Sequence, residues 1–331
     1  LYEAKLDARG ELVGTTWSDR GGSQRFVATR NPDAAIDAAA LDSAVAGQPF
    51  PVGNHWRATR GDAIVDVFGT FHVYDARMED TAERIAPFIE AADAVFLEAT
   101  KTELSALQSE VGTRPELIFI GPDEQTLPER LEEAEWQALS DALSERGLMP
   151  FLASKFQPWY VIVLLGIPPC AMETLISGTQ GLDGLIEARA QAAGVPTYAI
   201  EPYDTLFGIF DTLTKDDQMD LLRATIAMGS QAEDMFATMS DAYFAEEHRR
   251  LWEFSRIAAM KTPGMSPEKI ASDFALMEDM LLIRRNRAWM EVILPAATEG
   301  SRVVVAVGAA HLSGEEGVLN LLAREGFTLE R

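Results

Sequence analysis

Two blocks near opposite ends of the chain share one design: a buried β-type run, a Gly-x-x-His motif and then a helix. Residues 64–68 lead into Gly69-Thr70-Phe71-His72, and residues 303–307 lead into Gly308-Ala309-Ala310-His311. Glycine permits a sharp turn where a Cβ would clash, so each histidine projects beyond the carboxyl end of its strand. In open α/β sheets this edge is where ligands bind. If the two strands are parallel neighbours, both histidines gather at one edge of a sheet.

Two glutamates end other β-type runs in the same way. Glu98 follows residues 94–97, and Glu201 follows residues 197–200. Histidine and carboxylate groups are natural ligands for Zn, Mn, Co or Fe, and a metal with open positions activates water for hydrolysis. We therefore expect His72, Glu98, Glu201 and His311 at one rim, as metal ligands or acid–base groups. The alternatives are structural: a hydrogen-bonded histidine, a surface glutamate at Glu98 and a loop cap at Glu201.

A charged residue interrupts the apolar stripe of a long helix predicted from Ser266-Pro267 to Pro295. Arg285 lies inside that stripe, where its charge needs a carboxylate or a ligand oxygen, unless it snorkels at the edge of the stripe. We expect it to hold a carboxylate or to stabilise an oxyanion. Asn286 lies about 100° round the helix, so it need not share the partner of Arg285.

Composition excludes several classes of protein. The 331 residues include 52 Asp and Glu against 28 Lys and Arg, a net charge of −24, which disfavours binding to nucleic acid or to an anionic membrane. One cysteine permits neither an intrachain disulfide nor a Cys-rich zinc module. His-Glu-x-x-His, Gly-x-Ser-x-Gly, P-loop and Gly-x-Gly-x-x-Gly motifs are missing from the sequence. The longest apolar run, residues 159–167, is far shorter than the roughly 20 residues of a membrane-spanning helix.

The order of predicted elements indicates an α/β fold with a central mixed or mostly parallel sheet flanked by helices. We expect one α/β domain over residues 55–331 with a large helical insertion at about 123–295. Residues 1–54 are expected to form a peripheral hairpin, over residues 5–16, and a helix from residue 31 to about 45. The local patterns also predict a strand at 117–120 and a helix over 128–146. Capping boxes are expected at Asp80 with Glu83 and at Ser313 with Glu316.

The sequence begins at Leu1, and no export signal can be read there. Either a signal peptide has been removed or the chain was trimmed. We expect an exported protein, periplasmic or extracellular, with a cytoplasmic location as the alternative.

The two Gly-x-x-His blocks, at residues 69–72 and 308–311, resemble the TraB/PrgY/GumN family, which includes the Tiki-type membrane-anchored proteases. The family pattern is two Gly-x-x-His motifs with a glutamate downstream of the first, here represented by His72, His311 and Glu98. Weaker signatures from the middle of the family pattern are resembled by Gly181-Leu182-Asp183, by Glu201, and by Arg285-Asn286 with Trp289. The resemblance covers residues 55–331, and the exported bacterial members favour the removal of a signal peptide.

The resemblance implies a metal-dependent hydrolase, most concretely a metallopeptidase, that acts on a peptide or a small molecule. His72, Glu98 and His311 would hold a divalent Zn, Mn or Co ion, with Glu201 as fourth ligand or general base. Arg285 and Asn286 would complete the catalytic set. Two other hypotheses stay open: an esterase-like hydrolase without metal, in which a histidine is the general base beside Glu98, and a non-enzymatic protein that binds a small ligand, a peptide or haem.

Overall fold

The computed structural model describes residues 2–6, 12–17, 23–28, 38–176, 180–229, 232–260 and 266–331. Contacts divide the chain into two units, Leu1–Asp42 and Ser43–Arg331. In the first unit, β1 (Tyr2–Leu6), β2 (Leu12–Trp17) and β3 (Ser23–Ala28) pair antiparallel in sequence order, which confirms the hairpin predicted over residues 5–16. The described part of the helix predicted next is α1 (Ala38–Ala46), and residues 31–37 lie outside the described residues.

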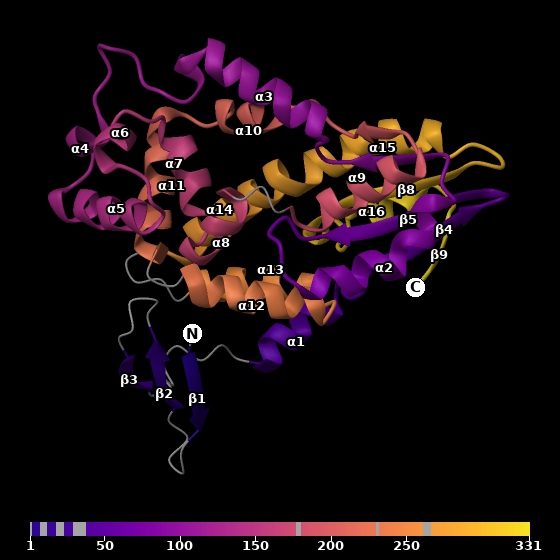
Figure 1. Cartoon of the computed structure of the whole chain (residues 1–331), viewed down its shortest axis with the longest axis horizontal. Coiled ribbons are helices and arrows are strands. Elements are labelled where there is room, and N and C mark those ends of the chain that lie inside the picture. The colour runs from indigo at the N-terminus through magenta and orange to yellow at the C-terminus, as the bar shows by residue number, and fades with distance from the viewer. Residues whose placement is uncertain are drawn as a thin grey trace. The chain divides into compact units, whose positions relative to one another are not determined.

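Within the described part of the second unit, six strands form one mixed sheet, as the sequence predicts (Figure 1). Their order across the sheet is β7-β6-β8-β5-β4-β9. The first four are parallel to one another, and β4 and β9 add antiparallel pairs at one side. The strands are β4 (His55–Arg60), β5 (Ala63–Thr70), β6 (Ala94–Leu97), β7 (Thr197–Ala199), β8 (Arg302–Gly308) and β9 (Thr328–Glu330).

The register of the parallel strands brings their carboxyl ends to one edge. Thr70 of β5 lies opposite Gly308 of β8, and Leu97 of β6 lies opposite both Ala306 of β8 and Ala199 of β7. Side chains that follow these four strands therefore start from the same edge. The expected rim consists of His72, Glu98, Glu201 and His311.

Helices cover both faces of the sheet. Successive residues of each central strand point to opposite faces, so each of these strands contributes side chains to two apolar cores. Val303, Val305 and Val307 of β8 belong to one apolar core, with α15 (Arg284–Ala296) and α16 (Val318–Arg324). Val304 and Ala306 belong to the other core, with α2 (Arg77–Glu90) and α9 (Leu182–Ala193). The nearly unbroken apolar run of β8 is explained by this double burial.

A third apolar core lies among helices that Figure 1 shows grouped apart from the sheet. These helices are α4 (Leu127–Arg130), α5 (Glu133–Glu145), α6 (Pro150–Ala153), α7 (Pro158–Leu165) and α11 (Lys215–Met228). Along the chain, the other described α-helices between β6 and β8 are α3 (Lys101–Thr113), α8 (Pro169–Ile176), α10 (Thr205–Asp211), α12 (Ala232–Phe244), α13 (His248–Ala259) and α14 (Pro267–Glu278). Within residues 123–295, α9, β7 and α15 belong to the layers of the sheet. No helix of the described residues has the length and apolar character needed to cross a bilayer.

Four local predictions are wrong. Residues 117–120 do not form a strand: Pro115–Leu117 is a short 3-10 helix, and Phe119 makes a single bridge to Phe156 without a neighbouring strand to extend it. The capping boxes at residues 80–83 and 313–316 are absent, since α2 begins earlier and α16 begins later than the pattern predicts. The helix predicted over residues 128–146 is broken between α4 and α5, because Leu131 and Glu132 have an extended backbone.

The long helix predicted from residue 266 to 295 is interrupted by a π-helical turn. Ser266 caps α14 as expected, accepting a hydrogen bond from the Lys269 N–H. The π-turn η4 (Asp279–Ile283) then joins α14 to α15. Such turns insert an extra residue into a helix and occur frequently at functional sites. Arg285 is the second residue after this turn.

Candidate functional site

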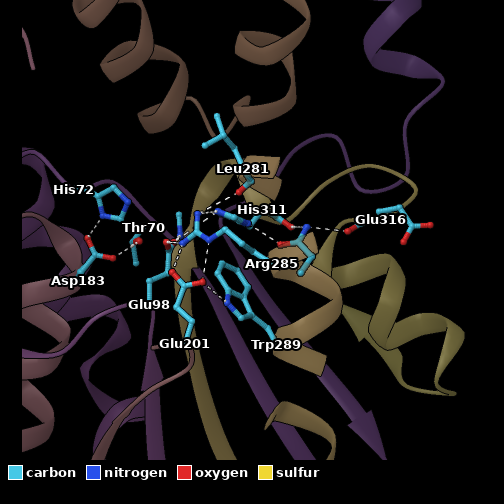
Figure 2. Close-up of polar contacts among 12 residues, drawn as sticks. Thr70, His72, Glu98, Asp183, Glu201, Leu281, Arg285, Trp289, His311 and Glu316 are labelled. Carbon is cyan, nitrogen blue, oxygen red and sulfur yellow. Dashed lines mark hydrogen bonds and ion pairs between the residues drawn. The ribbon is translucent and has the colours of Figure 1, made fainter. Parts of the chain in front are cut away.

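Five of the six predicted site residues meet directly at the carboxyl edge of the sheet, and His72 faces them (Figure 2). Glu98 and Glu201 come from the ends of β6 and β7, and His311 comes from the turn after β8. Arg285 and Asn286 reach the same edge from α15. The expectation that strand-end groups gather at one rim therefore describes the geometry of the molecule.

Arg285 lies at the centre of the site, and all five N–H groups of its guanidinium have acceptors. Nε and Nη2 donate to Glu201 at 2.9 and 2.5 Å, and Nη2 also donates to Glu98 Oε2 at 2.5 Å. Nη1 donates to the Leu281 carbonyl oxygen and to His311 Nε2, both at 3.2 Å. Since a guanidinium has five donors, none remains for a substrate carboxylate or an oxyanion. The partners of this charge are two carboxylates of the protein itself.

Glu98 is held from two sides. Its Oε1 accepts a hydrogen bond from the Gly308 N–H at 2.6 Å, while its Oε2 accepts from Arg285. Burial alone would raise the pKa of Glu98, but the positive charges of His72 and Arg285 that face it, with the hydrogen bond from the Gly308 N–H, hold that pKa below its usual value. A Cβ at residue 308 would lie 3.2 Å from Glu98 Oε1 and 3.6 Å from His72 Nε2. Gly308 therefore leaves the space across which the carboxylate and His72 face each other.

His311 is a neutral, buried imidazole whose two nitrogens are both bonded. Its Nε2 accepts from Arg285, which can only donate, so the Nδ1–H donates to Asn286 Oδ1 at 2.6 Å. The amide of Asn286 is fixed in turn by donating to the Glu316 carbonyl oxygen at 2.8 Å. Burial lowers the pKa of His311 to about 3. The Trp289 ring packs against it, with centroids 4.4 Å apart.

His72 belongs to a second polar group, with Asp183 and Thr70. Its Nδ1 lies 2.9 Å from Asp183 Oδ2, and the Thr70 hydroxyl donates to Asp183 Oδ1 at 2.5 Å. The negative charge of Asp183 raises the pKa of His72 to about 10. His72 is therefore an imidazolium at neutral pH, and its Nδ1–H donates to Asp183. Its side chain is 65% exposed, so its Nε2–H is accessible to a substrate.

A close backbone contact places Asp183 beneath His72. The amino end of α9 lies against the turn that carries the histidine, and the Leu182 N–H donates to the Phe71 carbonyl oxygen at 3.1 Å. A Cβ at Gly181 would lie 2.3 Å from that same oxygen, so no larger residue fits there without movement. Asp183 lies in the first turn of α9, where the helix dipole favours a negative charge.

A cavity of about 490 Å³ lies over this edge of the sheet. Its volume falls in the range of roughly 300–1,000 Å³ typical of small-molecule sites. His72, Glu98, Arg285 and His311 line it on the side of the sheet. The walls from α7, α11 and α12 are largely apolar, and they include Leu165, Ile167, Met228, Met235, Phe236 and Met239.

The four residues predicted as metal ligands do not fit a divalent cation in this arrangement. Both oxygens of Glu201 accept from Arg285, and its Oε2 also accepts from Trp289 Nε1 at 2.9 Å. His311 Nε2 accepts from Arg285, so the guanidinium occupies the position between these groups. Across the described ranges, no group of three or more His, Cys, Asp or Glu side chains is placed to hold a metal ion.

Asp183, Thr70 and Trp289 also belong to the site, although their sequence motifs predict no role for them. Asp183 follows Gly181, which was already part of a family-like signature, so the close approach required at that glycine is the signal that could have identified it. The two other histidines lie apart from the polar groups. His55 packs between aromatic rings beside Asp66, and His248 is buried and lines the cavity.

Comparison with known protein families matches residues 54–331 to the TraB/PrgY/gumN family. The matched segment begins just before β4 and includes every residue of the site described above. No curated protein matches the chain. Because the family match covers most of the chain, the protein belongs to the TraB/PrgY/gumN family.

Proposed function

We propose that this protein is a hydrolase that adds water to the carbonyl carbon of an ester or an amide held in the cavity. One observation carries the proposal: the His72 imidazolium, held by Asp183, faces the ionised Glu98 across Gly308 at the cavity wall. An accessible proton donor beside a buried carboxylate is a general acid–base pair. A hydrolase of this kind needs no nucleophilic serine or cysteine.

The two groups divide the proton transfers. Glu98 orients a water molecule and accepts its proton while the water oxygen attacks the carbonyl carbon. The Nε2–H of His72 stabilises the negative charge that develops on the carbonyl oxygen. It then donates its proton to the departing alcohol or amine as the C–O or C–N bond breaks, and the proton on Glu98 restores His72. Asp183 keeps the imidazolium oriented throughout.

The pKa of His72 separates this role from that of a general base. Because His72 must be protonated, we expect kcat/KM to stay level across neutral pH and to fall as the pH rises through about 10. A histidine general base, which is the esterase-like alternative, gives a rate that rises with pH through the same pKa. A pH–rate profile measured between pH 6 and 11 distinguishes the two.

The test uses p-nitrophenyl acetate and a fluorogenic peptide panel. We expect His72→Ala and Glu98→Gln each to lower kcat/KM by roughly 100-fold or more, the usual range for a general acid or base. His55→Gln serves as the matched control, since His55 lies outside the cavity lining, and it should keep the wild-type rate. Full activity in His72→Ala would refute the proposal.

The metallopeptidase that the family resemblance implies is tested in the same assay. The protein is treated with a chelator and then supplied with Zn²⁺, Mn²⁺ or Co²⁺. Peptide cleavage that disappears with the chelator and returns with one ion would establish that version, and it would require Arg285 to move away from His311 and Glu201. Activity that survives chelation supports the acid–base pair. Binding of a peptide or haem without any turnover would favour a non-enzymatic role.

We also propose that the protein acts outside the cytoplasm, in line with the expectation from its family. Fractionation of the producing cells, with immunoblotting of each fraction, tests this location. Recovery of the whole pool with the cytoplasmic markers would refute it.

A further inference from the structure

We propose that the cavity binds the hydrocarbon chain of an acyl substrate, so that the bond cleaved joins an unbranched acyl group to an alcohol or an amine. The inference rests on the proposed function, because it places the acyl carbonyl at His72 and Glu98. It is carried by a contrast between the polar edge of the sheet and the cavity walls that face it.

The walls that face the catalytic pair consist mainly of flexible apolar side chains. Three methionines, Met228, Met235 and Met239, lie on α11 and α12, with Phe236 between the latter two. Methionine side chains rotate freely and adapt to apolar partners of different length. Ile167 closes the wall on the side of α7. Such a surface suits a chain of methylene groups.

Polar groups in and behind these walls are bonded within the protein, except for the buried Nε2 of His248, which has no hydrogen-bond partner among the described residues. Arg146, which is 3% exposed, donates to the carbonyl oxygens of Ile167 at 2.7 Å and of Leu165 at 3.0 Å. The Thr225 hydroxyl donates to the Leu221 carbonyl oxygen at 2.8 Å. The Tyr243 hydroxyl donates to the Gly69 carbonyl oxygen at 3.0 Å.

This hydrogen bonding favours an acyl chain over a peptide. An extended peptide presents an N–H and a C=O at every residue, and each needs a partner once it is buried. A hydrocarbon chain presents neither group, so it gains burial without leaving a polar atom unpaired. The carbonyl of an acyl ester is its polar end, and the polar groups of the cavity lie at the sheet edge where His72 donates.

The reaction is a simple hydrolysis. The oxygen of water forms a bond to the acyl carbon, the bond from that carbon to the alkoxy oxygen or amine nitrogen breaks, and one proton passes to the leaving group. The products are a fatty acid and an alcohol or an amine, with no change in oxidation state.

The first experiment measures kcat/KM for p-nitrophenyl acetate, butyrate, octanoate and dodecanoate. Burial of one methylene group changes affinity by roughly fourfold, so we expect at least a tenfold rise from acetate to octanoate. If acetate is hydrolysed in a His72-dependent way but longer chains give no gain, the inference fails while the proposed function stands. The inference also fails if a peptide amide is cleaved faster than every acyl ester.

Variants that fill the cavity test whether the preference for long acyl chains arises from its methionine walls. Met239→Trp and the more tolerant Met228→Trp, whose side chain is 50% exposed, should each lower the octanoate-to-acetate ratio of kcat/KM at least tenfold. Met149→Trp is the matched control, because Met149 is 69% exposed and does not line the cavity. It should change neither rate. An unchanged ratio in both folded cavity variants would overturn the inference.

A binding measurement makes the result independent of turnover. Wild-type protein is titrated calorimetrically with decanoate and with acetate, and the titration is repeated with Met239→Trp. Saturable binding of decanoate that weakens at least tenfold in the variant supports the hydrocarbon site even if no ester is cleaved. The absence of decanoate binding in the wild type refutes it.

Discussion

His72 and His311 occupy the same position in the same motif, yet His72 is positively charged and His311 is neutral at neutral pH. The partner of the His72 Nδ1 is a carboxylate, and the side chain is 65% exposed, so the protonated form is favoured and the pKa rises to about 10. The partner of the His311 Nδ1 is the amide of Asn286, and the side chain is 6% exposed, so burial lowers the pKa to about 3. Environment decides the chemistry of each histidine.

Replacing Asp183 with Asn should return His72 towards its ordinary pKa. The variant keeps the shape of the side chain but removes the charge that raises the His72 pKa, so we expect that pKa to fall by at least one unit. The chain has four histidines, so NMR titration of the imidazole protons can follow His72 directly. Asp241→Asn is the control, since Asp241 is exposed and pairs with Arg77. An unchanged His72 pKa in Asp183→Asn would contradict the assignment.

The same ion pair has a defined effect on stability. Because the folded-state pKa of His72 lies above the unfolded value, the contribution of the pair is fully present below about pH 6.5. It is lost as the pH rises through about 10. The unfolding free energy of the wild type and Asp183→Asn should therefore converge between pH 7 and pH 10, as urea denaturation would show.

Removal of Asn286 should cost stability without any change of charge. Asn286→Leu leaves the buried Nδ1–H of His311 and the Glu316 carbonyl without their partner, so we expect a loss of about 1–3 kcal/mol in unfolding free energy. Gln137→Ala on the exposed side of α5 breaks only a surface hydrogen bond to Asp141, and it should change stability by less than about 0.5 kcal/mol. Equal effects of the two changes on urea denaturation would argue against a role for Asn286 in fixing the His311 tautomer.

Two local features of the helices position the side chains of the site. The π-turn η4 ends two residues before Arg285, and the Leu281 carbonyl within it accepts a hydrogen bond from the guanidinium. The first turn of α9 contacts the turn that carries His72 through the hydrogen bond from the Leu182 N–H to the Phe71 carbonyl oxygen. The sequence predicted one continuous 3.6-period helix through residues 266–295, because a π-turn leaves the apolar pattern on either side almost intact.

The close approach at α9 can be tested with a pair of glycines. Gly181→Ala would place a Cβ 2.3 Å from the Phe71 carbonyl oxygen, so we expect α9 to shift and stability to fall by about 1–3 kcal/mol. Gly112→Ala in α3 meets nothing within 4 Å and should stabilise the protein by up to about 1 kcal/mol. Urea denaturation gives both values, and the loss of the raised His72 pKa in Gly181→Ala would show that Asp183 has moved. A harmless Gly181→Ala would refute the packing argument.

Local sequence patterns predict which residues lie at the edge of the sheet, but not which of them form hydrogen bonds and ion pairs with one another. Each strand-end residue follows a β-type run that can be recognised by itself, and the parallel sheet then places Glu98 and His311 at one edge. The pairing of His72 with Asp183 spans 111 residues, and that of Arg285 with Glu98 spans 187. No periodicity reports which distant side chains meet, so the sequence suggested a metal where the fold places a guanidinium.

Arg285 joins the ends of β6, β7 and β8 to α15, and its removal should affect the entire domain. Arg285→Met leaves Glu98 and Glu201 buried side by side without a cation, at a cost of about 3–5 kcal/mol in unfolding free energy. The neighbouring Arg284→Met is the matched control, because its ion pair with Asp279 is largely exposed and is worth about 0–1 kcal/mol.

The sign of the pH dependence tests the cause of that loss. Without the guanidinium, the pKa of Glu98 in the folded state should rise above its unfolded value, so the destabilisation is largest at high pH and lessens as the pH falls through the raised pKa. The stability difference between wild type and Arg285→Met should therefore be smaller at pH 5 than at pH 8 in urea denaturation. Adding Glu201→Gln removes one of the two unpaired charges and should recover part of the loss at pH 8. If the double variant is no more stable than Arg285→Met at either pH, packing and not charge holds these strand ends together.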